Sequence, residues 1–293
     1  MFKGAFTAII TPFNRDQSVD YDRLEMLIER QIENGIDGIV PVGTTGESPS
    51  LNCEEHLRVI ETTVQVCRKR VKVIAGTGAN CTKEACELTA AARDCGADAT
   101  LQVTPYYNKP NQEGLLRHFE TVADLGLPVV LYNIPGRCGV EIALDTVVKL
   151  SAHPHIAAIK EAAGSVPRVS NILQRCDISV LSGDDPLTLP MLAVGAQGVI
   201  SVASNSAPRL VAEMVHAALD GRWEEARRIH QRCWRFFNAI FIDTNPIPIK
   251  AALALQGLAE EVYRLPLTPL RREMRIELEE CLRELDLLPS NKS

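Results

Sequence analysis

The chain has 293 residues, of which 46% are hydrophobic and 23% are charged, and its net charge is −6 at pH 7. This balance is typical of a globular protein and excludes a broad attraction for nucleic acid or acidic membranes, so small anions must be bound locally. The length suits a single α/β barrel, which typically needs about 250 residues.

The nine cysteines are odd in number and scattered, and no two form a CxxC pair. This argues against a disulfide framework or a zinc cluster and predicts reduced thiols in a cytoplasmic protein. Residues 1–6 lack the apolar core of a signal peptide, and no stretch of about 18 apolar residues could cross a membrane. We therefore expect neither a leader nor a membrane span.

Eight short apolar runs alternate with segments of helical periodicity. Strands separated by helices must return in parallel, and eight such units favour a closed (β/α)8 TIM barrel over an open sheet. A dinucleotide fold is disfavoured because residues 76–80 (GTGAN) lack the third glycine of its fingerprint. The predicted strands lie near residues 5–10, 38–42, 71–75, 99–103, 128–132, 156–160, 178–182 and 198–202.

The helical segments carry recognisable start and stop signals. Asp20 is placed to cap the first helix, which Gly35 closes, and Asn52 and Glu55 have the spacing of a capping box. Later helices are predicted over 82–95 and 208–219, each followed by a glycine.

Residues 222–293 exceed what the barrel needs and predict a C-terminal helical extension of about three helices. We expect helices over 223–242, after 245–248 (NPIP), and over 268–287. We therefore divide the chain into a barrel of residues 1–221, which carries the active site, and an extension of residues 222–293 packed on it. In the last helix an apolar stripe predicts packing against the barrel or another subunit; it comprises Leu270, Met274, Leu278, Cys281, Leu282 and Leu285.

Catalytic residues of such a barrel lie at the carboxyl ends of the strands and in the loops that follow. After the second strand, residues 43–48 (GTTGES) combine glycines that let backbone N–H groups converge with two hydroxyls, a pattern suited to an anion but also to an ordinary turn. Asp184 and Asp185, after the seventh strand, are expected to cap a helix that begins at Pro186 and to have no catalytic role.

The sixth run ends in Lys160, which leaves two interpretations. The lysine either closes the strand and extends to water, or its apolar setting makes the amine a nucleophile that forms a Schiff base with a carbonyl. Tyr107 and Tyr132 reach the same rim, where phenols could shuttle the protons of imine formation, and Arg137 could hold a carboxylate. These three side chains at the same rim favour the interpretation of Lys160 as a nucleophile.

Five motifs occur at strand ends and in the extension: 43–47 (GTTGE), 104–107 (TPYY), 132–137 (YNIPGR), 159–161 (IKE) and 245–250 (NPIPIK). Together they resemble the dihydrodipicolinate synthase family of pyruvate-dependent class I aldolases. The resemblance extends from about Phe2 to the last helix, and the spacing from Tyr132 to Arg137 separates the family from the otherwise similar sialic acid lyases.

The resemblance implies a role for each matching residue. Lys160 would form the Schiff base with pyruvate, Thr44 and Thr45 would hold the pyruvate carboxylate, and Tyr132 would relay protons to and from the imine. Tyr107 would complete the relay in the neighbouring subunit, with Thr44 linking the two tyrosines. The protein is therefore expected to be a homodimer or a homotetramer.

Arg137 would bind the carboxylate of the second substrate, L-aspartate 4-semialdehyde, while Gly183 and Val202 would contact pyruvate. Val202 departs from the isoleucine usual in the family. The implied reaction is the first committed step of diaminopimelate and lysine biosynthesis and requires neither a cofactor nor a metal.

Lysine-sensitive members of this family bind lysine between subunits, which implies a candidate allosteric site here. Glu84 could pair with the ammonium of lysine, and Asn80 and Tyr106 could bond its carboxylate. Cys53 and Pro49 depart from the usual residues, so any inhibition is expected to be weakened; by default His56 would be a surface or interface residue. The full set is Ser48, Pro49, Cys53, His56, Asn80, Glu84 and Tyr106.

Two alternatives remain beside the synthase. One is a retro-aldolase, such as N-acetylneuraminate lyase or 2-keto-3-deoxygluconate aldolase, against which Arg137 argues. The other is a catalytically inactive barrel that binds small acids, which would form no covalent adduct at Lys160.

Overall fold

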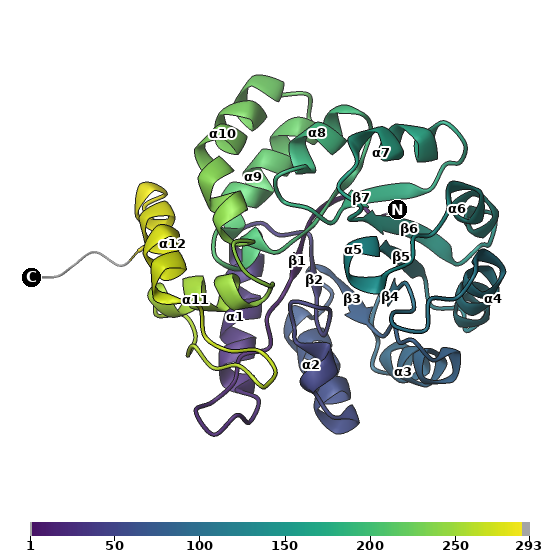
Figure 1. Cartoon of the computed structure of the whole chain (residues 1–293), viewed down its shortest axis with the longest axis horizontal. Helices are drawn as coiled ribbons and strands as arrows, with labels where there is room; N and C mark the ends of the chain where they lie inside the picture. The colour runs from purple at the N-terminus through teal and green to yellow at the C-terminus, as the bar shows by residue number, and fades with distance from the viewer. Residues whose placement is uncertain (1, 289–293) are drawn as a thin grey trace, which may run out of the picture.

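A computed structural model describes residues 2–288, in which eight parallel strands close into a barrel (Figure 1). Each strand pairs with the next along the chain, and β8 pairs with β1, which confirms the predicted barrel. Every predicted apolar run overlaps one strand, with ends within a few residues of the prediction. The strands are β1 Gly4–Ala8, β2 Gly38–Val40, β3 Lys72–Gly76, β4 Ala99–Val103, β5 Val129–Asn133, β6 Ile156–Glu161, β7 Ser179–Ser182 and β8 Gly198–Ser201.

Helices surround the barrel and form the extension that follows it (Figure 1). The barrel helices are α1 Tyr21–Glu33, α2 Cys53–Cys67, α3 Thr82–Asp94, α4 Gln112–Ala123, α5 Pro135–Cys138, α6 Leu144–Ser151, α7 Val166–Leu173, α8 Thr188–Ala193 and α9 Pro208–Leu219, with short 3-10 turns η1 Ser48–Ser50 and η2 Ala203–Asn205. The extension contains α10 Trp223–Ala239, α11 Ile247–Leu255 and α12 Arg272–Glu284.

The predicted caps fix where the first two helices begin. The side chain of Asp20 accepts a hydrogen bond from the backbone N–H of Arg23 at 2.9 Å. Asn52 and Glu55 form the reciprocal capping box, at 2.9 and 3.1 Å, which satisfies two of the backbone donors that a helix start leaves free. Gly35 ends the first unit with a φ of +82°, which glycine adopts without strain.

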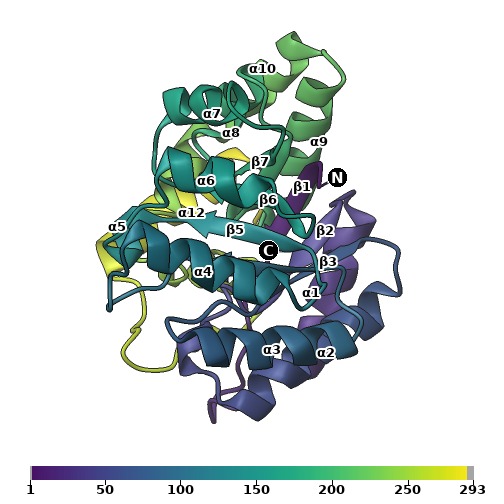
Figure 2. The same cartoon turned by 90° about the vertical axis from the view of Figure 1, so that its right-hand side faces the viewer.

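The barrel interior is a packed core. Phe6, Ile74, Leu101, Val130 and Ile200 belong to one buried cluster that fills it. In Figure 2 the arrow of β5 points toward α5, and the N-terminus lies at the opposite end of the barrel. The carboxyl ends of the strands, and the loops that follow them, therefore form one face, which faces the viewer in Figure 1.

The extension shares the largest hydrophobic cluster with α1, α2 and α9. On α12, Leu278, Cys281 and Leu282 are buried in this cluster, which confirms that the apolar stripe packs against the rest of the chain. The helices α10 and α12 are shorter than predicted, α11 begins at Ile247 within the 245–248 motif, and residues 289–293 lie outside the described residues. Within residues 2–288 no helix is both long and apolar enough to span a membrane.

Candidate active site

Lys160 and Tyr132 lie beside each other on adjacent strands at the carboxyl end of the barrel. The register of β5 and β6 pairs them directly, and both residues are only 5% exposed. The Nζ of Lys160 lies 4.1 Å from the centre of the Tyr132 ring. Among the described residues, this amine makes no hydrogen bond or ion pair, so no side chain competes with a substrate for it.

Gly183, directly after β7, lets the Lys160 side chain take this path. A Cβ at Gly183 would come within 2.9 Å of Cε of Lys160 and 2.7 Å of Cβ of Ala162, both closer than packed carbon atoms allow. The stem of the lysine is therefore packed against a glycine backbone, which restricts where its amine can lie.

Val202 directly follows β8 and is buried, and Asp185 holds its backbone. The carboxylate of Asp185 accepts from the backbone N–H groups of Val202 and Ala203, at 2.9 and 3.1 Å, and from Oγ of Ser201 at 2.5 Å. This corrects the prediction that Asp185 caps the next helix, because α8 begins at Thr188 and not at Pro186. Asp185 instead caps the turn η2, while Asp184 accepts from the backbone N–H of Leu187 at 3.3 Å.

The loop after β2 presents the two threonines. Thr45 is buried, Thr44 is partly exposed, and the loop closes through a bond from the backbone N–H of Glu47 to the carbonyl of Thr44 at 3.1 Å. The Nδ2 of Asn245 donates to Oγ1 of Thr45 at 3.0 Å. Because Oγ1 accepts this bond, the hydroxyl hydrogen of Thr45 remains free to donate to an anion.

Arg137 lies on the short helix α5, on the exposed side of the rim. Its Nη2 donates to the backbone carbonyl of Asn245 at 3.0 Å, and the remaining guanidinium N–H groups can bind a carboxylate. Asn245 thus contacts both the threonine loop and Arg137. Sequence reasoning noted Asn245 only within a motif, because it is 200 residues from Thr45 in the chain.

A buried polar network supports the two strands just beyond Tyr132 and Lys160. Glu161 accepts from Nδ2 of Asn133 at 2.9 Å and from Nε of Arg168 at 2.8 Å, while Asn133 accepts from the backbone N–H of Ile142 at 3.0 Å. Asn133 directly follows Tyr132 on β5, and Glu161 directly follows Lys160 on β6, while Arg168 comes from α7. The ion pair therefore anchors the carboxyl ends of β5 and β6, a role that the sequence did not indicate.

Tyr107 is not brought to the site within one chain. Its residue is 90% exposed, on the loop after β4, with a φ of +72°. The neighbouring Tyr106 instead lines a cavity on the same face, and burial raises the pKa of its phenol.

That cavity has a volume of about 790 Å³ and joins the two predicted sites. Thr44, Tyr132 and Arg137 line one part of it; the lining also includes the candidate effector residues Ser48, Pro49, Cys53, His56, Glu84 and Tyr106.

Two effector candidates are placed differently from the expectation. His56 is buried, not superficial, and its Nε2 lies 2.9 Å from the carbonyl of Gly76, while burial lowers the pKa of its imidazole. Asn80 does not line the cavity, and its carbonyl accepts from Asn108 at 2.8 Å. Within residues 2–288 no cluster of His, Cys, Asp and Glu is arranged to hold a metal ion.

The family model and the similar proteins identify the same family. The sequence model of the dihydrodipicolinate synthetase family matches residues 1–285. A 4-hydroxy-tetrahydrodipicolinate synthase of Geotalea uraniireducens is 52% identical over 291 residues, which cover 98% of this chain and 100% of that protein.

Solved structures agree in fold over nearly the whole chain. The chloride-inhibited dihydrodipicolinate synthase of Acinetobacter baumannii, complexed with pyruvate, has a TM-score of 0.97 and 44% identity, covering 98% of this chain and 100% of that one. The enzyme of Cyanidioschyzon merolae with lysine bound has a TM-score of 0.94 and 41% identity, covering 98% and 99%.

Proposed function

The chain belongs to the dihydrodipicolinate synthase family, and from this premise and the geometry of the site we propose that it is a 4-hydroxy-tetrahydrodipicolinate synthase. It condenses pyruvate with L-aspartate 4-semialdehyde, the first committed step of diaminopimelate and lysine biosynthesis. The observation that carries the proposal is the buried amine of Lys160 against the ring of Tyr132, which lines the same cavity as Thr44 and Arg137.

Lys160 opens the reaction as the nucleophile. Its Nζ attacks C2 of pyruvate, the carbinolamine loses water, and the resulting imine withdraws electrons so that the methyl group loses a proton and an enamine forms. The hydroxyl of Tyr132 carries protons to and from these intermediates. Support comes from the direct pairing of the two residues across β5 and β6.

The threonine loop and the end of β8 hold pyruvate in this scheme. Thr44 and Thr45 donate to its carboxylate, and Gly183 and Val202 contact its carbon skeleton. The hydroxyl of Thr45 is suited to this role because Asn245 occupies its acceptor position.

Arg137 receives the second substrate by its carboxylate. The enamine carbon then adds to the aldehyde carbon of L-aspartate 4-semialdehyde, which becomes a hydroxyl-bearing carbon. The substrate's own amine attacks C2 and displaces Lys160 as the ring closes, which returns the free lysine. The partly exposed guanidinium at the rim, held on one side by the carbonyl of Asn245, suits the capture of an incoming anion.

Tyr107 acts in the site of a neighbouring subunit, so the working unit is a homodimer or a homotetramer. Its near-complete exposure in one chain supports this role. The barrel of residues 1–221 carries the catalytic groups, and the extension of residues 222–293 contributes Asn245 as their support. The cytoplasm is the proposed location, supported by nine cysteines that are all free thiols.

Lysine is the proposed effector, bound in the part of the cavity around Glu84 and Tyr106. The solved relative with lysine bound supports the assignment, while Cys53 and Pro49 argue for weakened inhibition. Initial rates measured against increasing lysine test this, and a flat curve up to about 10 mM lysine would remove the effector from the proposal.

A substrate panel tests the proposed reaction against the alternatives. Purified protein is assayed for condensation of pyruvate with L-aspartate 4-semialdehyde and for release of pyruvate from N-acetylneuraminate or 2-keto-3-deoxygluconate. We expect turnover in the first assay only. Faster turnover of either sugar acid would replace the synthase with a retro-aldolase, and no turnover in any assay would favour an inactive binder.

A further inference from the structure

Glu47 and Lys250 form a buried ion pair directly beside the threonine loop. Their side chains meet at 2.5 Å between Oε1 and Nζ, and the two residues are 3% and 0% exposed. The Nζ of Lys250 also donates to the carbonyl of Thr11 at 3.2 Å and lies 4.2 Å from the centre of the Phe13 ring. The pair joins α11 of the extension to the loop after β2, two residues from Thr45.

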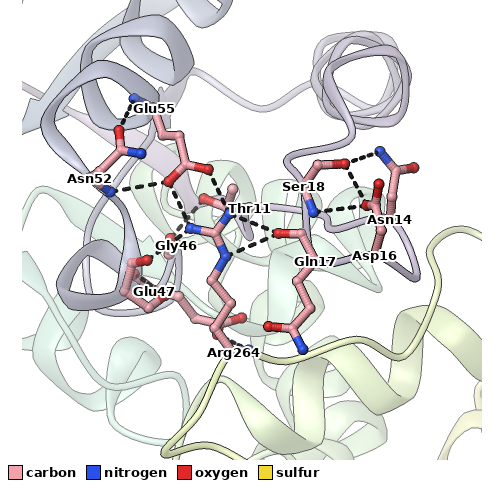
Figure 3. A network of polar contacts seen from close by, with 11 residues as sticks. Thr11, Asn14, Asp16, Gln17, Ser18, Gly46, Glu47, Asn52, Glu55 and Arg264 are labelled. Atoms are coloured by element: carbon pink, nitrogen blue, oxygen red, sulfur yellow. Dashed lines mark hydrogen bonds and ion pairs between the residues drawn. The ribbon is translucent and has the colours of Figure 1, made fainter.

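Arg264, from the segment between α11 and α12, completes the contact between the extension and this loop. Its guanidinium lies between Glu55 and Gln17, with bonds of 2.6 and 2.7 Å to Glu55 and of 2.7 and 3.1 Å to the carbonyl of Gln17 (Figure 3). It also donates to the carbonyl of Ser50 at 2.8 Å. These contacts use all five guanidinium N–H groups.

The backbone of Arg264 reaches the second oxygen of Glu47. Its N–H donates to Oε2 of Glu47 at 3.4 Å, so both carboxylate oxygens of Glu47 are held by the extension. The side chains of Glu47 and Lys250, together with Arg264, whose backbone holds Glu47, form one unit, which we name the loop clamp.

Glu47 needs such a clamp because of its backbone. Its φ is +53°, a left-handed conformation that a residue with a side chain adopts only when its surroundings hold it there. The backbone N–H of Glu47 closes the turn onto the carbonyl of Thr44. Relaxation of Glu47 to an ordinary φ would therefore open this turn and move the two threonine hydroxyls.

Stability alone is a poor explanation for the buried pair. Two buried charges lose their hydration, and replacing such a pair by apolar residues often leaves a protein as stable or more stable. The position of the pair, next to a strained turn at the binding site, fits a role in fixing geometry instead.

We propose that Lys250 and Arg264 are positioning residues for the reaction: through Glu47 they hold Thr44 and Thr45 in the arrangement that binds the carboxylate of pyruvate. This inference rests on the proposed function. It concerns residues that touch no substrate and act only through the threonine loop.

Lys250→Met and Glu47→Gln test the loop clamp. Each variant is assayed at a temperature well below its thermal midpoint. The yield of the borohydride-reduced pyruvate adduct is measured at increasing pyruvate concentrations and normalised to the yield at saturating pyruvate. We expect the half-saturating pyruvate concentration to rise about tenfold in each, while the KM for L-aspartate 4-semialdehyde stays within about twofold. The double variant should resemble the single ones, because both changes break the same contact.

Arg235→Met serves as the matched control. Arg235 pairs with Glu280 and Glu284 between α10 and α12, so its loss removes the same charge from the extension without touching the threonine loop. The half-saturating pyruvate concentration of this variant should equal that of the wild type. A wild-type value in the clamp variants too, with only a lowered thermal midpoint, would make the clamp purely structural and overturn the inference.

The outcomes separate this inference from the proposed function. A wild-type protein that traps no pyruvate contradicts the function itself, whereas trapping with unchanged half-saturation in the variants contradicts only the clamp. If Lys250→Met fails to fold, Glu47→Gln decides the question, because glutamine keeps the shape of glutamate but loses the charge that pairs with Lys250, and its amide nitrogen cannot accept a hydrogen bond as the second carboxylate oxygen does.

Discussion

The amine of Lys160 lies 4.1 Å from the ring centre of Tyr132, its direct neighbour across β5 and β6. Neither residue depends on a loop for its placement, because both lie within paired strands of a closed barrel. A nucleophile and a phenol carried on rigid strands keep their mutual geometry without any conformational change. The groups proposed to bind the substrates, the two threonines of the loop after β2 and Arg137 on α5, lie instead in segments that Asn245 of the extension contacts.

Gly183→Ala should reduce activity by displacing Lys160. The added Cβ would lie 2.9 Å from Cε of the lysine, so the side chain must shift, and we expect kcat/KM to fall at least about tenfold. Overpacking of this kind also lowers the free energy of unfolding by about 1–3 kcal/mol. Steady-state kinetics and thermal unfolding measure both effects.

Gly136→Ala is the control for that substitution, since a Cβ there meets nothing within 4 Å. It should retain nearly wild-type activity. Unchanged kinetics in Gly183→Ala would mean that the packing of Lys160 against Gly183 does not position the amine.

Arg137→Ala should weaken binding of the second substrate and leave the first unaffected. Loss of a charge-assisted carboxylate contact predicts a rise of about 10–100-fold in the KM for L-aspartate 4-semialdehyde. Trapping of pyruvate on Lys160 should be unchanged. Arg117→Ala, an exposed arginine on α4 paired only with Glu113, should alter neither value; a raised half-saturation for pyruvate in Arg137→Ala would contradict the assignment.

Tyr107 can be tested by subunit complementation. A hybrid of one Lys160→Ala subunit and one Tyr107→Phe subunit has a complete site only if tyrosine acts across the interface. Purified through two different tags, such a hybrid should show about half the activity of the wild type. Activity no higher than that of the Tyr107→Phe protein would place Tyr107 outside the neighbouring site.

His216 should make stability depend on pH. Its Nε2 lies 2.7 Å from Oδ2 of Asp37, which also accepts from the backbone N–H of Ala5, and this partner raises the pKa of His216 above its ordinary 6.5. A raised pKa stabilises the folded chain fully below about pH 6.5, and the effect is lost as pH rises through the folded pKa.

The thermal midpoint of the wild type should therefore exceed that of His216→Gln by more at about pH 6 than at about pH 9. Differential scanning calorimetry of both proteins measures this. A difference that stays constant, or that grows with pH, would show that the contact with Asp37 is not an ion pair.

Much of the barrel could be predicted because its signals are local. Each strand is a short apolar run, and residues such as Asn52 mark helix starts within one turn of the chain. The predicted start of α8 was wrong because Asp185 forms hydrogen bonds at the end of β8, a contact between segments that sequence spacing does not reveal. The burial of His56 was missed for the same reason, since its partner, the carbonyl of Gly76, comes from β3.

The support of the site could not be predicted from local pattern. Asn245 and Lys250 lie about 200 residues along the chain from Thr45 and Glu47, and a lysine on a helix of an extension normally indicates a solvated charge. Glu161 likewise follows Lys160 directly, yet only the fold shows that it pairs with Arg168. The assignment of substrates came from family resemblance, because the positions of the residues do not specify pyruvate.

The most direct test of the whole account is the identity of the lysine that reacts. Protein treated with pyruvate and borohydride, then digested and analysed by mass spectrometry, should carry one reduced pyruvyl group on the peptide containing Lys160, and Lys160→Met should carry none. Lys250 serves as an internal control, because it is also buried but is held by Glu47. An adduct on any other lysine, or none on Lys160, would show that Lys160 is not the Schiff-base nucleophile.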